Sequence, residues 1–142
     1  MRYTVSADIA APAERVWAVL SDVERMPAWT SSMTSVERLD PGPLRVGSSV
    51  RIKQPKFPAV IWRVTELTPA RSFAWVASGP GTTTTAEHAL APAADGRVTA
   101  TLTIRQSGFL APVFGLLTSA ITRRYVDTEL QGLKSRAEAV AV

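Results

Sequence analysis

The chain has 142 residues, no cysteine, a formal net charge of +4 at pH 7 and a hydrophobic content of 46%. This length and composition are typical of a single globular domain, and they exclude a disordered chain, a disulfide framework and thiolate chemistry. No segment reaches the ~18 uninterrupted apolar residues of a membrane span. The first residues lack a secretory core, so we expect a cytoplasmic protein without integral membrane association.

The sequence pI of about 10.1 raises the question of a nucleic-acid partner. Phosphate binding rests on clustered lysine and arginine side chains, whereas the basic residues of this chain are dispersed. Arg123 and Arg124, for example, are followed closely by Asp127 and Glu129. A mixed, solvated surface explains this pattern, and we expect no nucleic-acid partner.

The N-terminal residues predict a strand followed by two helical segments. From Tyr3 to Ala7 apolar and polar residues alternate, which is the period of a half-buried strand. Pro12 suits the first turn of a helix, and apolar residues then recur on one helical face, at Ala13, Val16, Trp17 and Leu20. A second, short helical turn is expected after Asp22, its candidate cap, and is expected to end at Pro27.

The middle of the chain predicts an antiparallel sheet, because turn residues cluster roughly every eight to twelve positions. The sharpest hairpin signal is Asp95-Gly96, since glycine adopts the positive φ that a tight turn needs. After Gly108 the apolar period becomes helical, and we predict one long amphipathic helix with Pro112 in its first turn. The expected strands of this region span residues 33–40, 47–54, 59–68, 71–79, 82–91 and 97–106.

Three stretches in this order resemble the START-like (SRPBCC) superfamily, which includes polyketide cyclases and the birch pollen allergen fold. They are residues 11–17 through Asp22 and Trp29, residues 62–75, and residues 129–138. The resemblance implies one START-like domain over residues 1–142, with an α+β helix-grip fold. In that fold a curved seven-stranded antiparallel sheet wraps around a long C-terminal helix, and two short helices follow the first strand. The resemblance does not imply an activity, because members include carriers, cyclases, hydroxylase subunits and chaperone regulators.

A hollow between the sheet and the helix is also expected on physical grounds. A bent sheet and a straight helix leave a gap that closes only where the facing side chains are large. Many candidates for inward positions here are small: Ala77, Thr82, Thr84, Ala86 and Ala100. The alternative is that bulky side chains from the other strands fill the gap.

His88 is the only histidine, and strand parity places it with Ala86 and Leu90, pointing inward. Its imidazole can contact a ligand or act as a general base, or it can be a core histidine satisfied by a neighbouring hydroxyl. The sequence places no second group of a catalytic dyad beside it. No set of converging ligands predicts a metal site, and we expect neither a metal nor another cofactor.

Aromatic residues and the start of the last helix are further candidates for function. Trp29, Trp62 and Trp75 can form the wall of an aromatic pocket, although core packing explains each of them equally well. Residues 109–117 are apolar on more than one face of the predicted helix. This pattern indicates a hydrophobic portal, a homodimer contact or a membrane-touching patch, or else burial under a loop.

Taken together, these features predict the binding of a hydrophobic small molecule, a lipid or polyketide-like compound, in a cavity between sheet and helix. The alternatives are a polyketide cyclase or dehydratase, and a lipid-carrier or protein-interaction module with the same fold. No catalytic residue is assigned. The expected ligand-binding residues are Trp29, Met33, Trp62, Trp75, His88, Leu90, Gln106, Phe114, Leu117 and Ile121.

Overall fold

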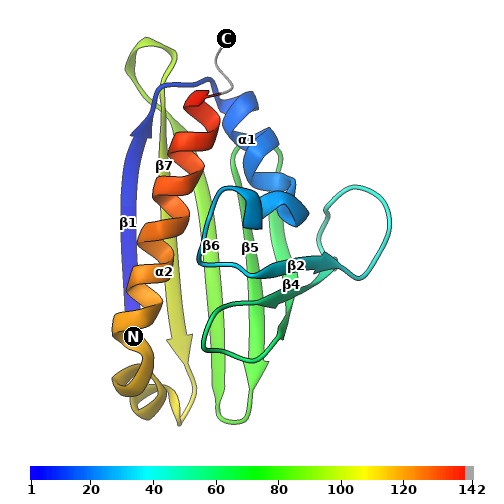
Figure 1. Ribbon diagram of the computed structural model, residues 1–142, viewed down its shortest axis with the longest axis vertical. Coiled ribbons are helices and arrows are strands. Elements are labelled where there is room, and N and C mark those ends of the chain that lie inside the picture. Colours follow the sequence, from blue (N-terminus) through cyan, green and yellow to red (C-terminus); the bar gives the residue numbers. More distant parts are fainter. Residues whose placement is uncertain (140–142) are drawn as a thin grey trace.

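The computed structural model describes residues 1–139 as seven strands, two α-helices and two short 3₁₀ helices (Figure 1). The α-helices are α1 (Ala13–Ser21) and α2 (Ala111–Ala139), and the 3₁₀ helices are η1 (Val23–Ala28) and η2 (Ala94–Gly96). The strands are β1 (Arg2–Ile9), β2 (Ser35–Arg38), β3 (Ser49–Lys53), β4 (Val60–Thr68), β5 (Ser72–Gly79), β6 (Thr82–Pro92) and β7 (Val98–Ser107).

The strands form one sheet in the order β1-β7-β6-β5-β4-β3-β2, and every neighbouring pair is antiparallel. β1 pairs with β7, so the first and last strands of the chain lie side by side. Figure 1 shows α2 running along one face of the sheet, with α1 beside the C-terminal end of α2. This arrangement is the α+β helix-grip fold with two short helices after β1, and it confirms the predicted fold class.

The structure changes two of the predicted element boundaries and confirms the predicted hairpin. The strand expected over 33–40 is only Ser35–Arg38, because Asp40 turns its carboxylate toward the loop that follows. Asp22 makes no capping hydrogen bond and instead pairs with Arg25 at 3.1 Å, and η1 runs on through Pro27 to Ala28. The hairpin predicted at Asp95-Gly96 is confirmed, with φ values of 60° and 72° at these two residues.

The core fills the end of the molecule where α1 and η1 lie. Large apolar side chains of these helices and of the second half of α2 meet the sheet there, among them Val16, Leu20, Met26, Leu130 and Leu133. Along α2, the structure buries Gly115 and then no further residue until Glu129. The side chains between these two residues are therefore not fully buried against the sheet, and packing does not close the gap beneath the first half of α2.

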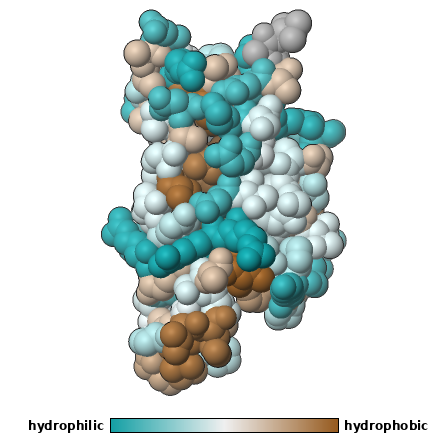
Figure 2. Space-filling view, turned by 60° about the vertical axis from the view of Figure 1, so that its left-hand side comes forward, coloured by the Kyte–Doolittle hydropathy of each residue, from teal (hydrophilic) through white to brown (hydrophobic). Residues whose placement is uncertain are grey.

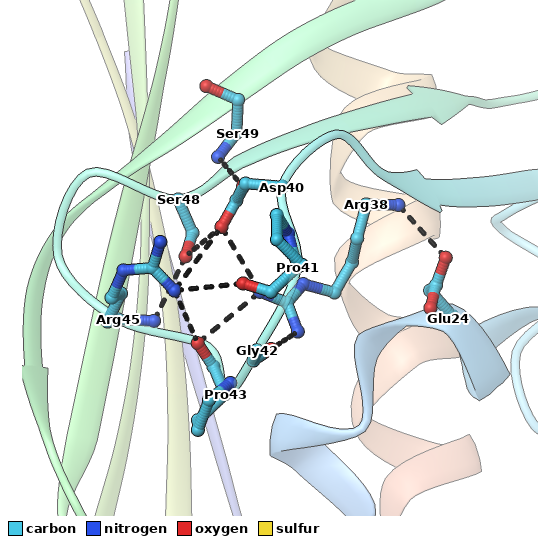
Figure 3. A network of polar contacts seen from close by, with 9 residues as sticks. All are labelled: Glu24, Arg38, Asp40, Pro41, Gly42, Pro43, Arg45, Ser48 and Ser49. Carbon is cyan, nitrogen blue, oxygen red and sulfur yellow. Dashed lines mark hydrogen bonds and ion pairs between the residues drawn. The ribbon is translucent and has the colours of Figure 1, made fainter.

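The loop between β2 and β3 is held by a network of polar contacts around Asp40 (Figure 3). The Asp40 carboxylate accepts hydrogen bonds from the Ser49 backbone N–H at 2.9 Å and from the Ser48 hydroxyl at 3.1 Å. Arg38 and Arg45 lie 3.3 Å and 3.7 Å from the same carboxylate. The hydrogen bond from Ser49 is the largest cause that lowers the pKa of Asp40 below its ordinary value of 3.8, followed by that from Ser48 and by the two arginines.

This network predicts how the stability of the protein responds to acid. A carboxyl group whose pKa is lower in the folded state stabilises the fold above its unfolded pKa, and that stabilisation is lost as the pH falls through the folded pKa. We expect Asp40→Asn to unfold at lower denaturant concentration than the wild type at neutral pH. The difference should shrink as the pH falls below 3.8. Denaturant titrations of both proteins across this range test the expectation, and a difference that is constant with pH contradicts it.

Candidate functional site

An apolar cavity lies between the sheet and the first half of α2. It has an inner chamber of about 70 Å³ and an outer chamber of about 240 Å³. Both chambers are lined mainly by strands β3 to β7 and by α2. The two chambers adjoin each other, because they share the lining residues Ile52, Gln54, Phe57, Trp62, Ile104 and Thr122.

The cavity exists because small side chains occupy the sheet positions that face α2. Ala86 lines the inner chamber, while Ala77 and Thr84, which are paired across β5 and β6, line the outer one. These three residues are among the small inward positions predicted from the sequence. Of the other two, Thr82 lines neither chamber, and Ala100 is packed in the core.

His88 and Glu129 form a buried polar pair at the inner chamber. Nε2 of His88 lies 3.1 Å from Oε2 of Glu129, and Nδ1 lies 3.3 Å from the carbonyl oxygen of Phe73. The imidazole stacks on the Phe73 ring with centroids 4.2 Å apart and meets Trp75 at a right angle. With 3% of His88 and 9% of Glu129 exposed, both contacts are shielded from water.

Both ring nitrogens of His88 face oxygen acceptors, and a neutral imidazole carries only one N–H. Two arrangements satisfy both contacts. In the first, an imidazolium donates to Phe73 and to the Glu129 carboxylate. In the second, a neutral imidazole donates from Nδ1 to the Phe73 carbonyl, and its Nε2 accepts a hydrogen bond from the protonated Oε2 of Glu129. The two differ only in where one proton sits between Nε2 and Oε2. Within residues 1–139 no group donates to Oε1 of Glu129, which leaves this oxygen available to an occupant of the cavity.

Polar groups also mark the outer chamber. Gln106 lines it and is 9% exposed, and its Oε1 has no hydrogen-bond partner within residues 1–139. A buried amide oxygen without a donor costs about 1–3 kcal/mol. Nearby, the Tyr125 hydroxyl donates to the carbonyl of Pro55, and its ring meets Phe57 edge-on. These contacts attach the loop between β3 and β4 to α2, so that the loop forms one side of the cavity.

Six of the ten predicted ligand-binding residues line this cavity. The inner chamber contains Met33, Trp62, Trp75 and His88, and the outer chamber contains Trp62, Gln106 and Phe114. The structure thus brings these side chains together around one space. That they contact a ligand stays a prediction.

The other four predicted residues line neither chamber. Leu90 belongs to the packed core, and Trp29 packs against α2, where its carbonyl oxygen closely approaches Gly132. Leu117 is 78% exposed, and Ile121 is half-buried outside the cavity. The row of α2 that faces the cavity runs through Thr122, Val126 and Glu129, one position further along the helix than the row that contains Leu117 and Ile121.

The sequence reasoning missed Glu129, Phe57 and Tyr125. A signal for Glu129 was present, because it lies three residues after Val126 and four before Leu133, on the inward stripe of the helix. An acidic residue on such a stripe indicates a buried partner. No local signal pointed to the contact between Tyr125 and the loop, because it joins residues separated by 70 positions.

The described part of the chain has no helix of the length and hydropathy needed to cross a membrane. Within residues 1–139, no three His, Cys, Asp or Glu side chains gather in the way that metal ligands do.

A curved antiparallel sheet, a long C-terminal helix and an apolar space between them define the helix-grip class of proteins. The sequence profile of the family described as polyketide cyclase / dehydrase and lipid transport matches residues 1–138. The chain belongs to this family. No curated protein sequence matches it.

Solved structures with the same fold are similar over nearly the whole chain. The Zhui aromatase/cyclase from Streptomyces sp. R1128 is 21% identical with a TM-score of 0.81, and the match covers 100% of this chain and 96% of that one. A START superfamily protein from Mycobacterium smegmatis is 16% identical with a TM-score of 0.79, with 98% of each chain covered. A hypothetical protein from Helicobacter pylori is 14% identical with a TM-score of 0.83, covering 96% of this chain and 88% of that one. At these identities the likeness shows the fold alone.

Proposed function

We propose that this protein binds a hydrophobic small molecule, a lipid or polyketide-like compound, in the cavity between the sheet and α2. The observation that carries the proposal is the pair of adjoining apolar chambers, with unsatisfied polar atoms at only a few points. Ligand sites of folded proteins are typically mostly apolar, with volumes from roughly 300 Å³ upward and a few polar groups that orient the ligand. The outer chamber alone, at about 240 Å³, approaches that range.

The polar atoms of the lining indicate which ligands fit. In the described part of the chain, Gln106 lines the outer chamber with an amide whose Oε1 is fully buried and has no donor, and Glu129 has an Oε1 without a donor at the inner one. A hydroxyl group of an apolar ligand satisfies Glu129, and a second hydroxyl satisfies Gln106 once its amide turns toward the chamber. Most of the binding free energy comes from apolar ligand surface, at about 25 cal/mol for each Å² removed from water. The two polar contacts set the orientation of the ligand.

Filling the cavity tests this function without disturbing the core. Ala77→Phe places an aromatic ring in the outer chamber, and we expect it to weaken binding of the uncharged dye N-phenyl-1-naphthylamine by about tenfold or more. Ser78→Phe is the matched control, because the neighbouring Ser78 is exposed and lines neither chamber. Fluorescence titration of the folded variants gives both affinities. Equal binding by Ala77→Phe and the wild type places the dye outside the cavity and contradicts the proposal.

The His88–Glu129 pair favours a second candidate function, a cyclase or dehydratase. When the shared proton is on Nε2 of His88, Glu129 is a carboxylate, and its Oε1 can take a proton from a carbon of a reacting polyketone and return it to an oxygen of the same molecule. His88 then acts by positioning the carboxyl group, because both its nitrogens already have partners in the protein. An enzyme of this kind loses turnover when the pair is replaced by apolar side chains, whereas a pure binding protein retains its ligand.

A further inference from the structure

In the first two turns of α2 the buried residues are small and the exposed residues are large and apolar, which is the opposite of an ordinary surface helix. The residues that face the protein are small, Ala111 and Gly115, and both are buried. The large apolar side chains point outward, and Leu116 and Leu117 are 84% and 78% exposed. We call this surface the apolar tip, and it consists of Phe109, Leu110, Val113, Phe114, Leu116 and Leu117.

The apolar tip lies at one end of the molecule. Figure 2 shows hydrophobic residues gathered as a brown patch at the lower end, which is where Figure 1 places the start of α2. Phe109 and Leu110 pack against Gly81 in the turn between β5 and β6, and Phe114 lines the outer chamber. The packing of the chain does not account for the size of the highly exposed Leu116 and Leu117. A contiguous apolar patch of this kind marks a surface that meets a partner.

The charges around the apolar tip identify that partner. The segments that make up this end of the molecule are residues 1–3, the turn 78–86, and residues 105–126. They contain four arginines, and two carboxylates lie one residue beyond them, at Glu87 and Asp127, so that arginines are in excess: Arg2, Arg105, Arg123 and Arg124. Glu87 is paired with Arg105, and Asp127 accepts a hydrogen bond from the Tyr3 hydroxyl at 2.7 Å.

An apolar end surrounded by arginines is complementary to one surface, a bilayer that contains anionic lipids. Apolar side chains enter the boundary between headgroups and acyl chains, while arginines contact the phosphates. A two-fold dimer through the same tip instead sets the arginines of one copy against those of the other, where each copy has more arginines than carboxylates. We propose that the apolar tip docks this protein on the surface of anionic membranes.

The tip is also continuous with the cavity. Phe114 lines the outer chamber and is itself partly exposed. Docking therefore places the outer chamber next to the bilayer, so that an apolar ligand passes between membrane and cavity without crossing water. This last step rests on the proposed binding function, whereas docking itself does not.

Sedimentation of the full chain with vesicles tests the docking. We expect the protein to bind vesicles of phosphatidylcholine mixed with phosphatidylserine and to bind pure phosphatidylcholine much more weakly. Leu116→Ser combined with Leu117→Ser should lower partitioning at least about tenfold. The matched control, Val46→Ser with Ile61→Ser, replaces two exposed apolar residues outside the tip and should bind as the wild type does.

A second pair of variants tests how much the arginine charges contribute to vesicle binding. Arg123→Glu with Arg124→Glu should reduce binding to the anionic vesicles by about tenfold. Arg71→Glu, at the opposite end of β5, should change it little. Ala77→Phe should bind vesicles normally, so a failure of docking is distinguishable from a failure of ligand binding. The proposal is overturned if the wild-type protein binds neither kind of vesicle. It is also overturned by a wild-type dimer, seen by analytical ultracentrifugation, that the Leu116 and Leu117 changes dissociate.

Discussion

Gly132→Ala is expected to destabilise the protein by about 3 kcal/mol, with a fall in Tm of roughly 10 °C. α2 crosses the end of η1 at this residue, and a Cβ added to Gly132 would lie 2.0 Å from the carbonyl oxygen of Trp29 and 3.0 Å from its carbonyl carbon. Backbone atoms cannot move aside as a flexible side chain does. The clash must therefore push α2 away from η1, and this disturbs the neighbouring core contacts of Leu130 and Leu133.

The same substitution at Gly115 is a control within the same helix. The atoms nearest to a Cβ at Gly115 are Met1 Cβ at 3.3 Å and Gln106 Oε1 at 3.5 Å, and a shift of a few tenths of an ångström at the first residue of the chain relieves the closer contact. Alanine also favours a helix over glycine by about 1 kcal/mol. We expect Gly115→Ala to be neutral or slightly stabilising. Urea titrations measure both effects, and equal stabilities of the two variants contradict the close approach of α2 to Trp29.

The second large effect concerns the buried pair. His88→Leu or Glu129→Leu alone should cost about 2 kcal/mol or more, because each leaves a buried polar partner without its hydrogen bond. The double variant should cost clearly less than the sum of the two single variants, since two leucines leave neither group unsatisfied. We expect a coupling free energy of about 2 kcal/mol from chemical denaturation. Strict additivity would falsify the view that the two residues act as one unit.

The double variant also separates the two candidate functions. It keeps an apolar lining, so binding of N-phenyl-1-naphthylamine should persist within a few-fold of the wild type. Turnover of a reactive polyketone, where the wild type shows it, should disappear with the mobile proton. Wild-type turnover by a folded double variant eliminates the pair from catalysis. Loss of dye binding together with turnover points instead to a collapsed cavity.

Local patterns predicted most of the fold. The alternation along β7 and the Asp95-Gly96 hairpin lie within single elements, and the structure has both where the pattern placed them. The short 3₁₀ helix η1 was harder to delimit, because Asp22 has a nearby arginine that competes for its carboxylate. Proline also fits the 3₁₀ conformation and does not have to end the helix.

The lining of the cavity was predicted less completely, and the phase of α2 explains why. Each residue turns an α-helix by 100°. An error of one position in the predicted inward row therefore gives Leu117 and Ile121, whereas the row that faces the cavity contains Thr122 and Val126. The apolar residues at the start of the helix do not reveal which row faces inward, because there the large side chains point outward.

Periodicity along the chain was therefore sufficient for the strands and the helices, because those follow from the order and spacing of neighbouring residues, whereas the helix-grip arrangement was implied by the resemblance to the START-like superfamily. The meeting of His88 with Glu129, 41 residues apart, followed only from the folded structure, as did the attachment of the loop at Pro55 to Tyr125. The physical reason is that such contacts depend on how sheet curvature and helix rotation combine in space, and neighbouring residues do not encode that combination.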